Sequence, residues 1–319
     1  MAEPTPTLKS DRMPSVSVVL PTYKRGAWLS KCLASLLRQT IMPSEIVVGR
    51  REGDEESAAV ICKYSRLSEG LIQEAIAGSN DNLAKSLNAA IAVTTGELVA
   101  MTDDDAEFPE DWLARLMELF TDDRVGGVGG RDNQAVNPGA ANVVGELQWF
   151  GRLIGNHHLA VGPVRDVDVL KGVNCCYRGD LLREIGIDHR LRGKGNVANW
   201  ELGISFELAR RGYRLVFDPS LQVTHHVGPR RDGDTNCRGG FNGPAHADAV
   251  FNETLLLREH LEGVHFAAFV LWSIAIGSSS IPGVLQLPRI VLKEGGATPA
   301  LRRWWYSTCG RIEGFRGAF

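Results

Sequence analysis

The first 130 residues alternate short apolar runs with segments whose apolar positions recur at helical spacing. The β-branched run at 16–20 ends at Pro21, as a buried strand of a parallel sheet does. At 26–38 the apolar positions fall three and four residues apart, which predicts an amphipathic helix. The pattern further predicts strands at 45–48, 71–75 and 97–102 and helices at 55–67, 81–93 and 109–120. Strands connected by crossover helices indicate an α/β fold with a mostly parallel sheet and helices on both faces.

Beyond residue 130 the pattern is less regular. We expect helices at 140–155, 200–211 and 246–262, and strands within 168–178 and at 215–217 and 221–223. The glycine-rich stretch at 125–131 lacks the spacing and the strand–helix context of a dinucleotide-binding turn, so the sequence does not favour nicotinamide binding.

Composition narrows the class of protein. The chain has 319 residues and a formal net charge of −3, so no overall positive field indicates a nucleic-acid partner. Its six cysteines contain no C-x-x-C pair, which favours buried thiols in a reducing compartment over a disulfide framework or a zinc knuckle. Residues 1–14 contain no apolar run and therefore no secretory signal, so we expect a cytoplasmic protein.

Three consecutive aspartates follow the strand predicted at 97–102. Ligands of parallel α/β sheets bind at the carboxyl ends of the strands, and Asp103, Asp104 and Asp105 stand at such an end. Neighbouring carboxylates repel one another unless a cation or hydrogen-bond donors neutralise them. A divalent ion held by one or two of these carboxylates and by substrate phosphate oxygens meets this requirement. A solvated acidic turn before the helix at 109–120 is the alternative.

Glu201 stands at the start of the helix predicted at 200–211, where Trp200 anchors the helix in the core. Partial desolvation beside Trp200 would raise the pKa of Glu201 toward that of a useful general base. A glutamate that only stabilises the helix dipole is the alternative.

Two pairs of basic residues follow the strand at 221–223. Histidine binds transition ions such as manganese, but adjacent strand residues face opposite sides of a sheet, so we expect at most one of His225 and His226 to be a ligand. A structural histidine is the alternative. Arg230 and Arg231 lie in a polar loop that is suited to phosphate binding or is simply solvated.

The order of these elements resembles that of the family 2 glycosyltransferases, which have the fold called GT-A. The resemblance extends from about residue 15 to residue 226, about two thirds of the chain. Its motifs are Pro21-Thr22-Tyr23-Lys24-Arg25, Asp103-Asp104-Asp105, Gly172-Val173-Asn174-Cys175-Cys176-Tyr177-Arg178, Trp200-Glu201 before Gly212-Tyr213-Arg214, and Asp218-Pro219 with Val223 and His225. No single motif is decisive, whereas the ordered set is highly specific.

The resemblance implies the transfer of a sugar, with inversion, from a nucleotide-diphosphate sugar to a glycan or lipid-linked acceptor. Glu201 aligns with the family's catalytic base, and Asp105 and His225 would hold Mg²⁺ or Mn²⁺ on the diphosphate. The residues expected at the nucleotide are Pro21, Thr22, Tyr23, Arg25, Lys85, Asn88, Asp103 and Asp104. Substrate contacts are expected from Asn174, Trp200, Arg230 and Arg231.

The sequence departs from the family pattern after the second strand. Family members often read V-D-D-G-S there, with the first acid at the base, whereas residues 47–52 read VVGRRE. The donor base is therefore not predicted, and Asp54 replaces that acid by analogy only. The expected organisation is a flexible tail at 1–14, a catalytic domain at 15–230 with a nucleotide-binding half (15–130) and an acceptor half (131–230), and a helical region at 231–319.

The C-terminal region bears on where the protein acts. Residues 264–281 are apolar but interrupted by His265, Gly277 and three serines, so a buried helix, an interfacial or re-entrant membrane segment and a spanning helix all remain open. Basic residues and Trp304-Trp305-Tyr306 between 289 and 319 suit an anionic membrane surface, and with it a lipid-linked or cell-envelope acceptor. An ordinary packed tail or an oligomer contact is the alternative.

Two other functions, nucleotidyl transfer and binding of a nucleotide sugar without catalysis, share some of these sequence features. A nucleotidyltransferase also combines an α/β sheet with metal-binding carboxylates, but it usually has a glycine-rich basic loop after the first strand, and residues 21–26 contain one glycine. A nucleotide-sugar-binding scaffold with a decayed site is opposed by the intact acids Asp103, Asp105 and Glu201.

Overall fold

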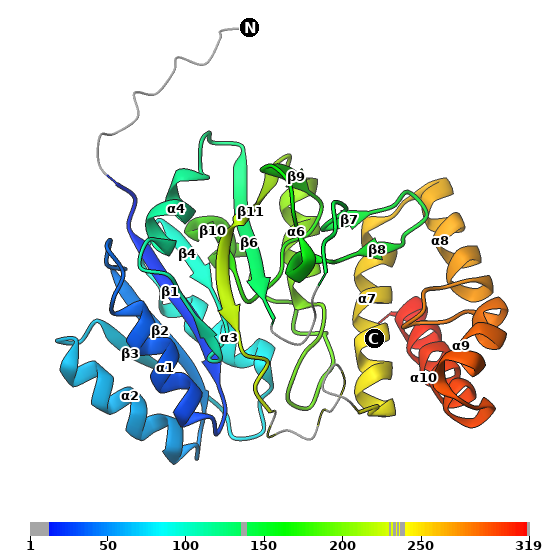
Figure 1. The fold of residues 1–319 in the computed structure, drawn as a ribbon, viewed down its shortest axis with the longest axis horizontal. Coiled ribbons are helices and arrows are strands. Elements are labelled where there is room, and N and C mark those ends of the chain that lie inside the picture. Colours follow the sequence, from blue (N-terminus) through cyan, green and yellow to red (C-terminus); the bar gives the residue numbers. More distant parts are fainter. Residues whose placement is uncertain are drawn as a thin grey trace, which may run out of the picture.

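The computed structural model describes residues 13–134, 139–229, 231, 234, 236 and 240–317. These residues form a nine-stranded sheet with helices on both faces (Figure 1). The strand order is β3 (Ile72–Ala77), β2 (Glu45–Arg51), β1 (Val16–Thr22), β4 (Leu98–Met101), β10 (Cys175–Arg178), β6 (Val125–Asn133), β11 (Arg214–His225) and β5 (Ala106–Glu107), with β9 (Arg165–Val167) beside β11. Strands β10, β5 and β9 run against the other six. The predicted α/β fold with a mostly parallel sheet is confirmed.

The inner strands are buried on both sides, so alternate residues of one strand belong to two different cores. In β1, Val19 packs into the core that includes α3, whereas Val18 and Leu20 pack into the core that includes α1. The helices of the first face are α3 (Leu83–Val93), α5 (Gly179–Ile185) and α6 (Trp200–Arg210), and those of the second are α1 (Gly26–Leu36), α2 (Glu55–Leu67) and α4 (Trp112–Glu118). This two-sided burial explains why the strands read as continuous apolar runs.

The helix predicted at 140–155 is wrong. That segment contains the short antiparallel pair β7 (Glu146–Leu147) and β8 (Leu153–Ile154), followed by the short 3₁₀ helix η1 (His157–Leu159). Gly145 and Gly151 have φ angles of +58° and +82°, a conformation that ends a helix and that side chains with a Cβ atom rarely adopt. At Gly151 an added Cβ atom would also lie 2.5 Å from the ring of Phe269, so glycine is required there.

The glycine-rich stretch at 125–131 forms most of the buried strand β6, which the apolar pattern did not predict. An added Cβ atom would lie 2.7 Å from the Tyr177 ring at Gly127 and 2.9 Å from Leu170 at Gly129. Glycine therefore makes room for two bulky neighbours on one face of this strand. The strands predicted at 215–217 and 221–223 are parts of one strand, β11, with a register shift against β6 between them.

The C-terminal helices form the end of the molecule opposite β3 (Figure 1). Helix α7 (Gly243–His260) packs against α6 and against the long helix α10 (Ala297–Arg316). Between them in sequence lie α8 (Gly263–Ala275), the 3₁₀ helix η2 (Val284–Gln286) and α9 (Leu287–Glu294). Within the described ranges, none of the helices combines the length and the apolar character that crossing a membrane would need.

Asn174 connects strands β6 and β11 with helix α4. Its fully buried side chain donates from Nδ2 to the carbonyl oxygens of Arg131 (3.1 Å) and Leu221 (2.9 Å), and Oδ1 accepts from Nε1 of Trp112 (2.9 Å). We expect Asn174→Ala to lower the free energy of unfolding by about 3 kcal/mol, because the buried indole N–H of Trp112 would lose its acceptor. Urea denaturation measures this change.

The matched control is Asn133→Ala in β6. The side chain of Asn133 donates to Gln222 in an exposed hydrogen bond, so this substitution should change the free energy of unfolding by about 0.5 kcal/mol or less. Equal losses in the two variants would contradict the structural role of Asn174.

Candidate active site

The carboxyl ends of β1, β2 and β4 meet at one edge of the sheet. After β4 the chain turns through the three aspartates and enters β5. Strand β5 pairs with the last residues of β11, in the register Ala106 to His225. This pairing brings His225, which is far away in the sequence, beside Asp105.

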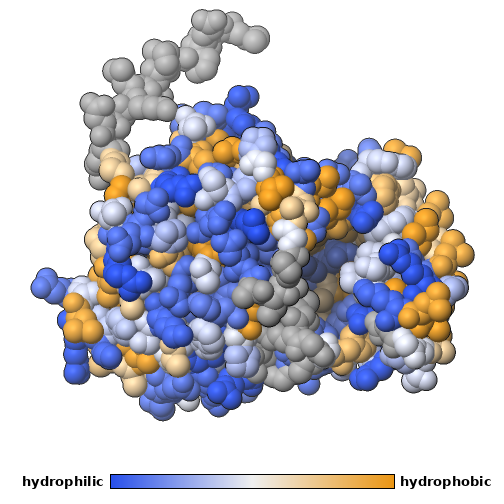
Figure 2. Space-filling view, viewed as in Figure 1, coloured by the Kyte–Doolittle hydropathy of each residue, from blue (hydrophilic) through white to orange (hydrophobic). Residues whose placement is uncertain are grey.

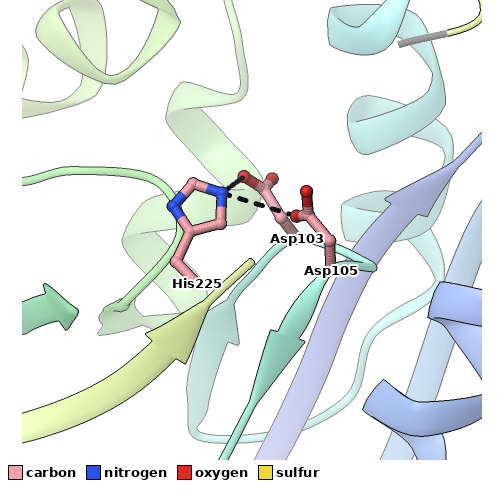
Figure 3. Close-up of side chains that lie close together, drawn as sticks. All are labelled: Asp103, Asp105 and His225. Carbon is pink, nitrogen blue, oxygen red and sulfur yellow. Dashed lines mark ion pairs between the residues drawn. The ribbon is translucent and has the colours of Figure 1, made fainter. Parts of the chain in front are cut away.

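Asp103, Asp105 and His225 form a cluster whose potential ligand atoms all lie within 4.8 Å of one another (Figure 3). Nε2 of His225 lies 3.4 Å from Oδ1 of Asp105 and 4.0 Å from Oδ2 of Asp103. Asp105 and His225 are buried, and Asp103 is partly exposed. Two carboxylates and an imidazole that converge in this way are a suitable ligand set for a divalent ion.

Asp132 of β6 fixes the orientation of His225. Its Oδ2 atom lies 3.1 Å from Nδ1 of His225 and also accepts from Lys171 and Gln134, each at 2.6 Å. A carboxylate on one ring nitrogen leaves the other nitrogen directed at the cluster, as is usual for histidine ligands of metals. Asp132 was not predicted from the sequence. It comes near His225 because the parallel register of β6 and β11 sets it opposite Val223, and this register exists only in the folded sheet.

Two cationic groups balance the buried carboxylates. The guanidinium of Arg25 pairs with Asp105 and lies 3.0 Å from Oδ1 of Asp104. Burial raises the pKa of Asp105, but His225 and Arg25 outweigh this effect and hold that pKa well below its ordinary value. Burial lowers the pKa of His225, but its hydrogen bonds to Asp105 and Asp132 outweigh burial and raise the pKa to about 9. The carboxylates therefore require compensating positive charge at this position.

The neighbours of the cluster residues take other partners. Asp104 accepts from Oγ1 of Thr22 at 2.7 Å, and burial raises its pKa to about 7. His226 lies 2.7 Å from Glu107, and its ring contacts that of Trp28. Of the two adjacent histidines, His225 faces the cluster and His226 faces away, as alternation along an extended chain requires.

A pocket opens beside the cluster at the same edge of the sheet. The predicted residues that line it are Pro21, Thr22, Tyr23, Arg25, Asp103, Asp104, Asp105 and Arg231. The lining residues that sequence analysis missed are Arg51, Leu83, Ser86, Gly195 and Asn196. The first motif of the chain and the aspartate turn, more than half of the lining, therefore share one cavity.

Arg51 ends β2, where the sequence departs from the family pattern. Its guanidinium lies 4.2 Å from the centroid of the Tyr23 ring, so the pocket combines an aromatic face with a cation. Two residues earlier, an added Cβ atom at Gly49 would lie 2.4 Å from the carbonyl oxygen of Ser86. The sequence predicted that a strand ends near Arg51. It did not predict that the Arg51 side chain enters the pocket, because that direction depends on stacking against Tyr23.

Asp54 does not line the pocket but supports it. Its carboxylate accepts from the backbone N–H of Ser57 (3.1 Å), which caps α2, and from that of Lys24 (2.7 Å). Lys24 has a φ angle of +52°, so this hydrogen bond holds a strained loop in place. The loop carries Arg25 into the site.

Lys85 and Asn88 of α3, both expected at the nucleotide, also lie outside the pocket lining. Lys85 is exposed and pairs with Asp81 at 2.7 Å. Asn88 exchanges two hydrogen bonds of 2.8 Å with the backbone of Ile187. Both side chains therefore serve contacts within the protein.

The expected substrate contacts divide into three groups. Asn174 uses its side-chain amide inside the core, as described for the fold. Trp200 is buried against Gly172, where an added Cβ atom would lie 2.2 Å from the indole ring. Arg231 lines the pocket, and Arg230 lies outside the described residues.

Glu201 is the second residue of α6 and faces the loop before β10. The N–H of Gly172 donates to Oε1 at 3.4 Å, while Oε2 is buried without a hydrogen-bond partner among the described residues. Burial raises the pKa of Glu201 above its ordinary value. A carboxylate with a raised pKa and an unsatisfied oxygen is suited to accept a proton.

The loop before β10 also connects Glu201 with the aspartate turn. Gly172 contacts Glu201, and the carbonyl oxygen of the next residue, Val173, accepts from Oγ1 of Thr102 at 2.9 Å. Thr102 directly precedes Asp103, whose negative charge adds to the effect of burial on the pKa of Glu201. Glu201 therefore lies at the same sheet edge as the cluster, although it does not line the pocket.

Fold and site together define an α/β protein with a candidate divalent-metal cluster, an adjoining aromatic and cationic pocket, and a separate buried carboxylate. Residues 17–146 match the sequence profile of glycosyl transferase family 2. This match covers less than half of the chain and supports the predicted resemblance to the family 2 glycosyltransferases, and the chain has the GT-A fold of such enzymes.

Individual proteins are similar over longer parts of the chain. The glucosyl-dolichyl phosphate glucuronosyltransferase of Haloferax volcanii is 26% identical over 237 residues, which cover 66% of this chain and 69% of that protein. The mannosyltransferase PcManGT from Pyrobaculum calidifontis, solved with GDP-Man and Mn²⁺, has a TM-score of 0.56 at 17% identity and covers 95% of this chain and 88% of its own. Residues 1–349 of S. aureus TarS, solved with UDP-GlcNAc, have a TM-score of 0.58 at 15% identity, with coverage of 95% and 89%. These structural likenesses show the fold.

Proposed function

We propose that this protein transfers a sugar from a nucleotide-diphosphate sugar to an acceptor hydroxyl, with inversion at the anomeric carbon and with the help of a divalent metal ion. The observation that carries the proposal is the cluster of Asp103, Asp105 and His225 beside the pocket, with Glu201 joined to the same sheet edge. A single displacement inverts the anomeric carbon and needs one base on the acceptor side. Glu201 supplies that base.

The pocket supports a nucleotide sugar as the donor. Tyr23 offers an aromatic face to the base, and Arg25 and Arg51 offer guanidinium groups to the diphosphate. The two solved proteins of the same fold contain GDP-Man and UDP-GlcNAc. Those donors differ in their base, so they support a nucleotide sugar as the donor but do not indicate which base it carries.

Asp103, Asp105 and His225 would hold the metal ion. The mixed set of carboxylates and an imidazole fits Mn²⁺ better than Mg²⁺, which prefers oxygen ligands alone, and the similar mannosyltransferase contains Mn²⁺. When bound, the ion supplies positive charge to the leaving diphosphate. Asp132 keeps Nε2 of His225 directed at the cluster, and Arg25 adds a further cation at the same edge.

Glu201 accepts the proton of the acceptor hydroxyl. As the hydroxyl oxygen bonds to the anomeric carbon, the bond from that carbon to the diphosphate oxygen breaks and the proton passes to Glu201. The burial that raises its pKa makes this carboxylate a stronger base than an exposed one. Close packing of Trp200 against Gly172 holds the first turn of α6, and with it Glu201, in position.

The acceptor is proposed to be a glycan or a lipid-linked sugar. The name of the Haloferax relative identifies a glucosyl-dolichyl phosphate as its acceptor. This relative matches 66% of the chain at 26% identity, and the proposed acceptor class rests on that likeness.

A donor screen tests the proposed function. In the presence of Mn²⁺, at least one nucleotide sugar should release its nucleoside diphosphate when a suitable acceptor is supplied, and chelation of the metal with EDTA should return the release to background. Chromatography of the nucleoside diphosphate measures both. Binding of nucleotide sugars without release would identify a scaffold, and formation of pyrophosphate from a nucleoside triphosphate would identify a nucleotidyltransferase; either result would overturn the proposal.

A further inference from the structure

The C-terminal helices expose large apolar side chains that the catalytic proposal does not use. They are Leu271 and Ile274 in α8, Val284 and Leu285 in η2, Leu292 in α9, and Leu301, Trp305 and Ile312 in α10. Leu285 is 71% exposed and Leu292 is 85% exposed, so neither contributes much to the core. Contiguous exposed apolar surface of this kind marks an interaction site more often than single scattered residues do.

These side chains lie on helices that pack against one another, since α9 contacts both α10 and η2, and η2 contacts α8. An apolar pocket lies between α8, η2 and α10. Ile274 of α8, Val284 of η2 and Ile312 of α10 line it. Leu271 lies one turn before Ile274 in α8, and Trp305 lies about two turns before Ile312 on the same face of α10. Figure 2 shows hydrophobic residues gathered along the outer edge of this region, over α8 and α9. We call this the α8–α10 surface.

Positive charge lies beside the apolar side chains. Arg289 and Lys293 of α9 and Arg302 of α10 are exposed. In α9, Leu292 points away from the buried Ile290, and the two basic residues stand on the flank between them. Among the described side chains of α8, α9 and α10 the one acid is Glu313, and it pairs with Arg192. The surface therefore combines protruding apolar groups with exposed basic groups.

We propose that the α8–α10 surface docks the protein on an anionic lipid bilayer. Leucine side chains and Trp305 enter the boundary between headgroups and acyl chains, where tryptophan is favoured, and the basic groups meet anionic headgroups. A second copy of the chain fits this surface less well, because a two-fold contact would bring two patches of the same positive charge together. The inference does not depend on the identity of the donor or the acceptor.

Vesicle flotation tests the proposal with the full chain. The protein should float with vesicles of phosphatidylcholine mixed with phosphatidylglycerol and should float less with vesicles of phosphatidylcholine alone. The double substitution Leu285→Glu and Leu292→Glu should weaken binding to the mixed vesicles by about tenfold or more, since it removes two apolar groups and adds two negative charges. A second variant, Arg289→Gln with Lys293→Gln, should weaken binding to mixed vesicles and leave the weak binding to phosphatidylcholine unchanged.

The matched control is Leu67→Glu. Leu67 is 67% exposed at the end of α2, on the opposite side of the molecule, so its substitution should leave flotation unchanged. Thermal melting and release of nucleoside diphosphate in solution should match the parent protein in all these variants, because every substituted residue is exposed and distant from the pocket. Failure of the parent to float, or equal flotation of the double variant, would overturn the proposal. The proposal would also be overturned if neither protein bound vesicles and light scattering showed that the parent is a dimer and the double variant a monomer.

Discussion

Glu201→Gln should reduce turnover by about 10²–10⁴-fold while donor binding stays close to that of the parent protein. Glutamine keeps the size of the side chain, so it preserves the contact with Gly172, but it cannot accept the proton of the acceptor hydroxyl. Release of nucleoside diphosphate measures turnover, and titration calorimetry with the donor measures binding. Activity of the parent should also fall as the pH is lowered through the raised pKa of Glu201, because only the ionised carboxylate accepts a proton.

The matched control for this substitution is Glu207→Gln in the same helix. Glu207 pairs with Arg210 and Arg211 near the surface, at 2.6 Å and 2.7 Å, so its loss should leave turnover unchanged. Full activity of Glu201→Gln would remove Glu201 from the mechanism. A joint loss of turnover and donor binding would instead indicate that Glu201 has a structural role.

Asp105→Asn should weaken Mn²⁺-dependent binding of a nucleoside diphosphate by about 100-fold or more. Loss of a residue that hydrogen-bonds to a metal ligand typically lowers metal affinity by about 10- to 100-fold, and loss of a direct ligand should lower it further. Asp105 is the residue that His225, Arg25 and the N–H of Gly228 all contact, so its charge organises the whole cluster. A thermal-shift screen of nucleoside diphosphates identifies the base to use, and calorimetry with and without Mn²⁺ measures the effect. Unchanged metal-dependent binding would exclude Asp105 as a ligand.

Two further variants calibrate this result. Asp132→Asn should weaken the metal-dependent binding by about 10- to 100-fold, because Asp132 acts through the orientation of His225 and does not belong to the cluster. Asp123→Asn removes a fully exposed carboxylate and should have no effect. An order of effects in which Asp132→Asn exceeds Asp105→Asn would contradict the proposed ligand set.

Most of the pocket could be predicted from the sequence because its residues sit at the ends of strongly apolar strands. Thr22 and Tyr23 follow one such strand and Asp103 follows another, so hydrophobic pattern and the geometry of parallel sheets place them together. Arg51 lies at a third strand end but was not chosen, because its direction depends on the ring of Tyr23.

Residue type and motif alone do not show whether a polar side chain faces the pocket or the protein interior. Its motif predicts that Asn174 contacts the substrate. In the structure, its side-chain amide forms hydrogen bonds with Trp112 and with two backbone carbonyl groups in the core. Lys85 and Asn88 occupy the predicted helix, but their side chains turn to Asp81 and to the backbone of Ile187. Whether a polar side chain meets a ligand or the protein is decided by its neighbours in space, which the motif does not specify.

Local pattern was sufficient for the succession of strands and helices and for the position of the aspartate turn at the carboxyl edge, because apolar periodicity is a property of neighbouring residues. Long-range packing brings the candidate metal ligands together. The pairing of β5 with β11 sets His225 beside Asp105, and the register of β6 with β11 sets Asp132 behind His225. Both contacts join residues far apart in the chain, and the sheet selects them through hydrogen bonds and burial that exist only when all its strands are assembled.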